Sequence, residues 1–189
     1  MSKVVPACKP ITVVTFRGDR TGAFGAAIRR KLDDEKHGRG PGPTILECLL
    51  FAGHTGVSLD AGTVVYGFNP DAGTLLVWQL IEGLEKGNAF PGIVRDDTGV
   101  FAAATTHGLT VVSFDVVFPN PSFQKFERRP NRERKGSQFT YGFPDGDGDC
   151  NCTTWLERLG LPLLTGRMKE FVNLYWISTY LRRRFGECV

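Results

Sequence analysis

The sequence lacks any apolar run long enough to cross a membrane. Nowhere do roughly 18 consecutive apolar residues occur, the minimum for a transmembrane helix. Residues 1–10 contain no continuous apolar stretch before Pro6 and Pro10, so no signal peptide is recognisable. We therefore expect a protein of the cytoplasm of the producing cell. Secretion by a route that reads no N-terminal signal stays open.

Strong net charge and paired cysteines are also missing. The chain has 23 basic and 20 acidic residues, and a net charge of +3 is too small to predict nucleic-acid binding by bulk electrostatics. Its five cysteines are an odd number, which cannot all be joined in disulfides. This count indicates free thiols and a reducing compartment.

The remaining composition is that of one globular domain. The chain has 189 residues, of which 41% are hydrophobic and 23% charged, and this mixture is typical of a folded protein. We expect a single domain over residues 1–189, with residues 37–43 as a linker and residues 119–138 as an insertion loop. No internal repeat is evident.

The apolar patterning predicts a mixture of strands and helices. Strands are expected at residues 11–16, 45–59, 63–68, 100–106, 109–118 and 139–143, with the fourth and fifth forming a hairpin that turns at His107 and Gly108. Helices are expected at residues 23–36, from about 152, and at 167–184, and residues 75–84 fit either element. This order favours an α+β fold, an antiparallel sheet with packed helices.

Cys152 lies where a short helix is expected to begin. Asn151 is a good N-cap, and Trp155, Leu156 and Leu159 form an apolar stripe. The free N–H groups and the dipole of a helix start stabilise a thiolate and can hold an oxyanion. Cys152 is therefore our candidate nucleophile, and a buried structural cysteine is the alternative. Cys150 falls in an irregular Asp-Gly run that suits this role less well.

A nucleophilic thiol needs a base, and His54 is the best placed of the three histidines. His37 lies in a Gly/Pro-rich stretch and His107 at an expected turn, whereas His54 lies on an expected strand between small residues. If the following hairpin is tight, Tyr66 falls near His54, and its hydroxyl could orient the imidazole. A backbone carbonyl could do the same, the site could work as a dyad, or Tyr66 could be a plain aromatic residue of the sheet.

Two motifs resemble a known superfamily. His54-Thr-Gly-Val-Ser-Leu-Asp-Ala-Gly-Thr-Val-Val-Tyr66 resembles the histidine hairpin of the NlpC-type papain-like enzymes, with a third catalytic position twelve residues after the histidine. Asn151-Cys152-Thr-Thr-Trp155 resembles the helix start of the circularly permuted branch, which includes the lecithin:retinol acyltransferase-like proteins. His54 precedes Cys152 by 98 residues, an order and spacing similar to that branch. The third position, commonly a histidine or another polar residue, is Tyr66 here.

The resemblance implies a permuted papain-like core and a cysteine hydrolase without cofactor or metal. Cys152 would attack a carbonyl, His54 would carry the proton, and a thioester acyl-enzyme would form. Our first expectation is cleavage of an amide bond of peptide or peptidoglycan type. A lipid acyltransferase or a thiol lipase is the alternative among enzymes, and a bacterial effector delivered to another cell is a further idea by analogy.

Outside enzymes, the alternative is an interaction protein. The basic run from Lys125 to Lys135 could bind an anionic surface, although a solvated loop is the more usual explanation, and its length also suits a lid. The expected C-terminal helix carries apolar residues on several sides and ends in Arg182-Arg-Arg184. It fits core burial or docking to a membrane surface or a protein partner.

Three sets of residues that could suggest a metal or phosphate site depart from the known motifs. A calcium-binding EF-hand loop that started at Asp145 would require a glycine at its sixth position and a glutamate at its twelfth, where Cys150 and Leu156 stand. Zinc binding by Cys150, Cys152, His54 and His107 would need a wider spacing of the cysteines. Gly18 to Gly22 lacks the Lys-Ser/Thr ending of a phosphate loop.

Overall fold

The computed structural model describes residues 9–60, 62–118, 139–142 and 150–158. In chain order its elements are β1 (Lys9–Arg17), α1 (Ala23–Lys36), α2 (Ile45–Ala52), β2 (Gly53–Ser58), β3 (Tyr66–Pro70), α3 (Val77–Glu85), β4 (Phe90–Asp96), α4 (Thr98–Thr106), β5 (Val111–Phe118), β6 (Thr140–Tyr141) and α6 (Thr154–Arg158).

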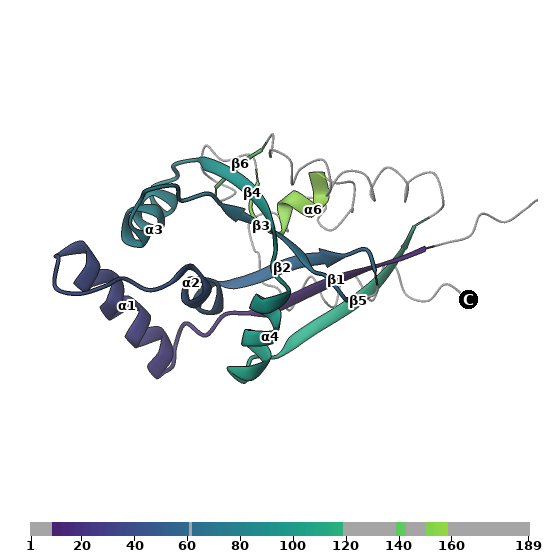
Figure 1. Cartoon of the computed structure of the whole chain (residues 1–189), viewed down its shortest axis with the longest axis horizontal. Coiled ribbons are helices and arrows are strands. Elements are labelled where there is room, and N and C mark those ends of the chain that lie inside the picture. Colours follow the sequence, from purple (N-terminus) through teal and green to yellow (C-terminus); the bar gives the residue numbers. More distant parts are fainter. Residues whose placement is uncertain (1–8, 61, 119–138, 143–149, 159–189) are drawn as a thin grey trace, which may run out of the picture.

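The strands form one six-stranded sheet in the order β5-β1-β2-β3-β4-β6 (Figure 1). Every neighbouring pair is antiparallel, so the prediction of an α+β fold on an antiparallel sheet is confirmed. The ladder between β2 and β3 is short, with only Gly56↔Gly67 and Val57↔Tyr66 in register. The remaining residues of β2 therefore border β3 without a regular ladder.

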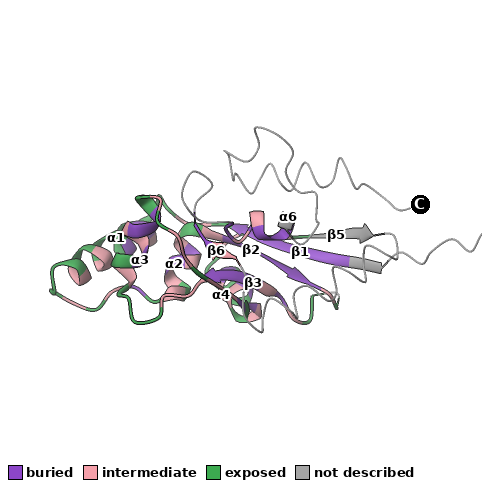
Figure 2. Ribbon diagram, turned by 90° about the horizontal axis from the view of Figure 1, so that it is seen from above, coloured by how far each residue is buried: buried purple, intermediate pink, exposed green. Residues whose placement is uncertain are grey.

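Helices cover both faces of this sheet. Trp155 and Leu156 of α6 are fully buried in a cluster with Val57 and Phe68, and the Trp155 ring stacks on Phe68 at 5.7 Å between centroids. On the opposite face, Phe101 of α4 packs edge-on against Phe16 of β1 at 5.6 Å (Figure 1). Figure 2 shows the result, with buried residues running through the central strands.

The segment Ile45–Ala52 is helix α2, so the predicted strand over residues 45–59 is wrong in its first part. A capping box starts the helix: the Glu47 backbone N–H donates to the Thr44 hydroxyl at 3.2 Å, and the Thr44 N–H donates to the Glu47 carboxylate at 2.8 Å. Gly53, with φ of 92°, ends it. Only residues 53–58 continue as a strand.

The predicted hairpin of residues 100–106 and 109–118 is also wrong. Residues Thr98–Thr106 form helix α4, whose first carbonyl, that of Asp97, accepts from the Val100 N–H at 2.8 Å. Strand β5 lies within the expected range but pairs with β1. The sequence interpretation assigned no strand to Phe90–Asp96, which is β4 and pairs with β3.

Other predictions fare better. Strand β1 and helix α1 occupy their expected positions, and the ambiguous residues 75–84 are largely helix α3. Strand β3 begins at Tyr66 rather than at residue 63. Residues 37–43 connect α1 to α2 through turns and bends.

The expected loop at 119–138, the acidic run at 145–149 and the helix at 167–184 lie outside the described residues. Among the helices within the described ranges, none has the length and apolar character needed to cross a membrane.

Candidate active site

Cys152 lies immediately before α6, on a turn fixed by the Asn151 side chain. The Asn151 Oδ1 atom accepts from the N–H groups of Thr153 and Thr154 at 2.9 and 3.0 Å, as an N-cap does. The burial of Trp155 and Leu156 then holds this turn against the sheet. Cys152 is half-buried and free of disulfide bonding.

His54 lies near the start of β2, opposite Phe16 of β1. Its side chain is 1% exposed, so its ring nitrogens must find partners within the protein. The Nε2 atom lies 2.8 Å from Oδ2 of Asp97. The Nδ1 atom has no partner of hydrogen-bond geometry among the described residues. The ring interacts electrostatically with the neighbouring Cys152 thiol, and Nδ1 is the nitrogen left for proton exchange with it.

Asp97 joins β4 to α4 and is 5% exposed. An aspartate at a helix N-cap usually accepts from the first turn of its own helix, but the Asp97 side chain makes no such bond. Its neighbour Asp96 instead accepts from the N–H and the hydroxyl of Thr98, at 3.0 and 2.6 Å. The Asp97 carboxylate is thereby directed to His54.

Asn69 on β3 is the second donor to Asp97. Its Nδ2 atom donates to Oδ2 of Asp97 at 2.7 Å, and its side chain is 2% exposed. Asn69 lies two residues after Gly67 on β3, so its side chain faces the same side of the sheet as position 67. The carboxylate is thus held on the face of the sheet that carries the imidazole.

Gly67 provides the space in which this contact forms. A Cβ atom built at Gly67 would overlap both Oδ2 of Asp97 and Nε2 of His54. The hydrogen bond between imidazole and carboxylate therefore passes directly over a residue without a side chain.

The thiol and the imidazole shift each other's pKa in opposite directions. Burial acts to raise the pKa of the Cys152 thiol, but His54 and hydrogen bonds from the Thr55 backbone and the Thr153 side chain outweigh it, and the pKa is lowered. Burial acts to lower the pKa of His54, but Asp97 and the Cys152 sulfur outweigh it and raise the pKa to about 9. This arrangement favours the thiolate form of Cys152 and the imidazolium form of His54.

The hydroxyl of Tyr141 on β6 lies against Cys152 as well. Burial, followed by the charge on the neighbouring sulfur, raises the pKa of Tyr141 well above its ordinary value, while the Cys152 backbone N–H acts in the opposite sense. The phenol therefore keeps its proton. Its ring packs on Phe68, with 5.6 Å between centroids, so the hydroxyl and the Cys152 N–H are held together beside the sulfur.

The structure brings Cys152 and His54 together, but it does not bring Tyr66 to the imidazole. Tyr66 pairs with Val57, three positions from His54 along β2, and successive residues of a strand face opposite sides. Its ring packs in the cluster of Val57 and Trp155. Asp97 holds the ring nitrogen that the sequence interpretation assigned to Tyr66 or a backbone group.

The two other histidines considered from the sequence are not part of this cluster. His37 ends α1 and His107 ends α4. Within the described ranges, no three His, Cys, Asp or Glu side chains are grouped as metal ligands. Cys150 is buried in the core cluster of Trp155, and burial raises the pKa of Cys48 to about 12.

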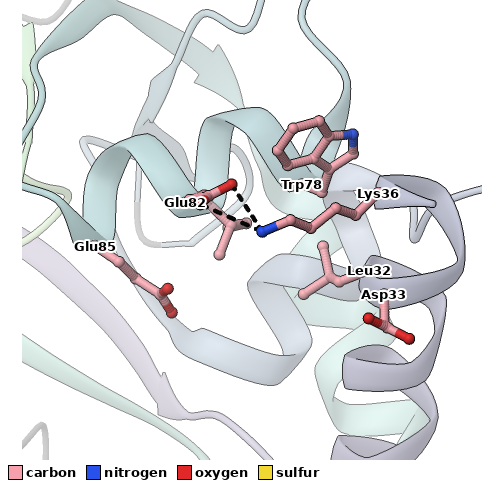
Figure 3. A pocket seen from close by; sticks show the side chains of 7 residues that line it. Leu32, Asp33, Lys36, Trp78, Glu82 and Glu85 are labelled. Atoms are coloured by element: carbon pink, nitrogen blue, oxygen red, sulfur yellow. Dashed lines mark hydrogen bonds and ion pairs between the residues drawn. The ribbon is translucent and has the colours of Figure 1, made fainter.

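A groove lies between α1 and α3 (Figure 3), and none of its lining residues belongs to this cluster. Its lysine is paired within the chain, because Lys36 Nζ lies 3.3 Å from Glu82 and 5.4 Å from the centre of the Trp78 ring. No cysteine, histidine or serine lines it. The groove therefore offers neither a thiol or hydroxyl nucleophile nor an imidazole base.

Comparisons with protein-family models, with curated proteins and with solved structures found no significant match. The class of this protein therefore rests on its own geometry, an antiparallel α+β fold in which Cys152, His54 and Asp97 form a linked cluster.

The sequence did contain a signal for Asp97. Asp96-Asp97-Thr98 before an apolar run is typical of a helix N-terminus. The interpretation of residues 100–106 as a strand concealed it. Asn69 and Gly67 carry no signal of their own, because their role depends on the register between β2 and β3.

Proposed function

We propose that this protein is a cysteine hydrolase that cleaves an amide bond, of peptide or peptidoglycan type, through a thioester acyl-enzyme. The observation that carries the proposal is the linked arrangement of Cys152, His54 and Asp97, in which the pKa of the thiol is lowered and that of the imidazole raised. A nucleophilic cysteine needs these two changes, because the thiolate is the attacking form and the imidazolium is the acid.

In the first half-reaction, the Cys152 thiolate attacks the amide carbonyl carbon. The resulting oxyanion accepts hydrogen bonds from the Cys152 backbone N–H and the protonated Tyr141 hydroxyl, two donors that lie beside the sulfur. The His54 imidazolium gives its proton to the leaving nitrogen. The C–N bond breaks, and the amine departs from a thioester on Cys152.

In the second half-reaction, the neutral His54 imidazole removes a proton from water. The hydroxide formed attacks the thioester carbonyl, and the thiolate leaves as the carboxylic acid is released. Asp97 holds Nε2, which keeps Nδ1 directed at the reacting atoms. Protons and bonds balance over the two steps, with water as the only co-substrate.

A permuted papain-like core is part of the proposal. Its support is the chain order, with the histidine strand β2 preceding the cysteine turn and α6 packing on the sheet that carries β2. The free thiols of Cys48 and Cys152 agree with the reducing cytoplasm we propose for the producing cell.

The test uses a panel of fluorogenic peptide amides, peptidoglycan stem peptides, fatty-acyl esters and phospholipids. We expect release from at least one amide and, after an acid quench, a mass increase on Cys152 equal to the acyl group. Cys152→Ala should abolish both signals, while Cys150→Ala should retain them.

Turnover confined to the esters or phospholipids would replace the amidase with a thiol lipase or an acyltransferase. Retention of activity in Cys152→Ala would overturn the site. Absence of any Cys152 adduct with every substrate, together with an ordinary thiol pKa, would favour a non-enzymatic interaction protein.

A further inference from the structure

Three buried threonine hydroxyls form a continuous chain from the Cys152 sulfur to the backbone of His54. The Cys152 Sγ atom lies 3.9 Å from the Thr153 hydroxyl, which donates to that of Thr55 at 3.3 Å. The Thr55 hydroxyl lies 3.0 Å from that of Thr15, and Thr15 donates to the His54 carbonyl at 3.2 Å. The threonines come from the α6 turn, β2 and β1, and none is more than 2% exposed.

The number of protons fixes the direction of this chain. It has four contacts, and each threonine hydroxyl can donate only one proton. The His54 carbonyl can only accept. When Cys152 is a thiol, the S–H supplies the fourth proton, and all four contacts are satisfied with each group donating toward His54.

Ionisation of Cys152 removes one of the four protons. If the direction were kept, Thr153 would present a lone pair to the negative sulfur. If the three hydroxyls rotate, Thr15 donates to Thr55, Thr55 to Thr153, and Thr153 to the sulfur, and only the His54 carbonyl loses its hydroxyl donor. A hydrogen bond to a charged acceptor is stronger than one to a neutral carbonyl, so the reversed direction is favoured.

We infer that Thr153, Thr55 and Thr15 form a hydrogen-bond relay that reverses its direction when Cys152 ionises. The inference deepens the proposed function and rests on its assignment of Cys152 as the nucleophile. The threonines are positioning residues, because they act on substrate only through the sulfur. The three threonines keep their hydroxyl protons. The thiol proton passes to His54, and the hydroxyls only rotate.

Other groups act on the same sulfur and have to be held constant in a test. His54 on β2 and, through it, Asp97 after β4 favour the thiolate, and so does the Thr55 backbone N–H. Among the described residues, Tyr141 on β6 and the buried Cys150 thiol are further titratable groups near it. None of these groups is altered by replacing a threonine with valine, which has the same shape without the hydroxyl.

The relay predicts that substitutions at its two ends shift the pKa of Cys152 in opposite directions. Thr153→Val removes the donor to the thiolate, so the pKa of Cys152 should rise, by about one pH unit for the loss of one charge-assisted bond. Thr15→Val removes the carbonyl contact that ionisation would otherwise break. The thiolate then forms at less cost, and the pKa of Cys152 should fall.

The experiment measures the rate of iodoacetamide alkylation of Cys152 against pH, with fragment mass spectrometry separating Cys152 from Cys150. Thr12→Val is the matched control, since Thr12 is a buried threonine of β1 whose hydroxyl donates to Asp115 at 2.7 Å, outside the relay. We expect the midpoint to rise in Thr153→Val, to fall in Thr15→Val and to stay unchanged in Thr12→Val. Thr153→Ser, which keeps a hydroxyl, should restore the wild-type midpoint.

Shifts in the same direction for Thr153→Val and Thr15→Val, or no shift in either, would overturn the relay. The two variants alter separate segments, so a folding defect in one leaves the other informative, and Thr153→Ser tests the same position with its hydroxyl kept. Failure of the proposed function is distinguishable, because it would appear as an ordinary midpoint in the wild-type protein or as the absence of hydrolysis.

Discussion

His54 and Asn69 donate to the same atom, Oδ2 of Asp97, at 2.8 and 2.7 Å. One donor comes from β2 and the other from β3, and the acceptor follows β4. The carboxylate is therefore fixed from two neighbouring strands, and a buried charge is tolerated because it has a cationic partner and an amide donor.

Replacing Asp97 with asparagine should weaken catalysis by about 10²- to 10⁴-fold, the usual contribution of general acid–base groups. The amide removes the negative charge that favours imidazolium, so the pKa of His54 should fall from about 9. The pH profile of Cys152 alkylation measures this change. Asp96→Asn is the matched control, because Asp96 bonds Thr98 in the adjacent turn. Equal profiles for the two variants would contradict the role of Asp97.

Replacing Gly67 with alanine should disrupt the contact between His54 and Asp97. The added methyl overlaps His54 and Asp97, and overpacking of this kind costs about 1–3 kcal/mol of unfolding free energy. Hydrolysis should fall with it, as measured by thermal unfolding and initial rates. At Gly99, in α4, an added Cβ meets nothing within 4 Å, so Gly99→Ala should keep both. A fully active Gly67→Ala protein would show that the contact is dispensable.

The pH dependence of acyl-enzyme formation should be bell-shaped. The leaving amine needs the His54 proton, so the rate should fall as pH rises through about 9, the pKa to which His54 is raised. At the acid end, the rate should persist below the ordinary pKa of a thiol, because the pKa of Cys152 is lowered. Single-turnover rates across the pH range test both limits. An alkaline limit near 6.5, the ordinary histidine pKa, would contradict the paired state.

Cys152 and Cys48 should differ sharply in reactivity. At neutral pH, iodoacetamide should label Cys152 at least about 100-fold faster, because the thiolate is the reactive form and burial raises the pKa of Cys48 to about 12. Timed labelling followed by mass spectrometry gives the two rates. In denaturant the rates should converge, which separates an effect of the fold from one of local sequence. Similar native rates would count against an activated thiol.

Replacing Thr44 with alanine should lower the unfolding free energy by about 0.5–2 kcal/mol, because it removes the hydroxyl of the α2 capping box. Thr44→Ser keeps that hydroxyl and should cost little. Urea unfolding compares the two. Equal stability of both variants would indicate that the start of α2 does not depend on its cap.

Local patterns predicted the elements that local interactions determine. Helix α1 has a long periodic stretch and β1 an unbroken β-branched run, and both occur where expected. Helix α2 is eight residues of mostly apolar character, a length at which a buried helix and a strand look alike. Its capping box was the discriminating signal. Of the site, two short motifs gave Cys152 and His54, whereas Asp97 depends on strand β4 and on its pairing with β3, which no local pattern records.

The assembly of this site from segments far apart in the sequence has a consequence for the nascent chain. The groups that activate Cys152 come from β2, from the residue after β4 and from the α6 turn, so an unfolded chain has only an ordinary thiol. Chemical reactivity at this sulfur is then a property of the completed sheet alone. An activated thiolate at Cys152 is therefore a marker of the native state, and the nascent chain lacks it until folding is complete.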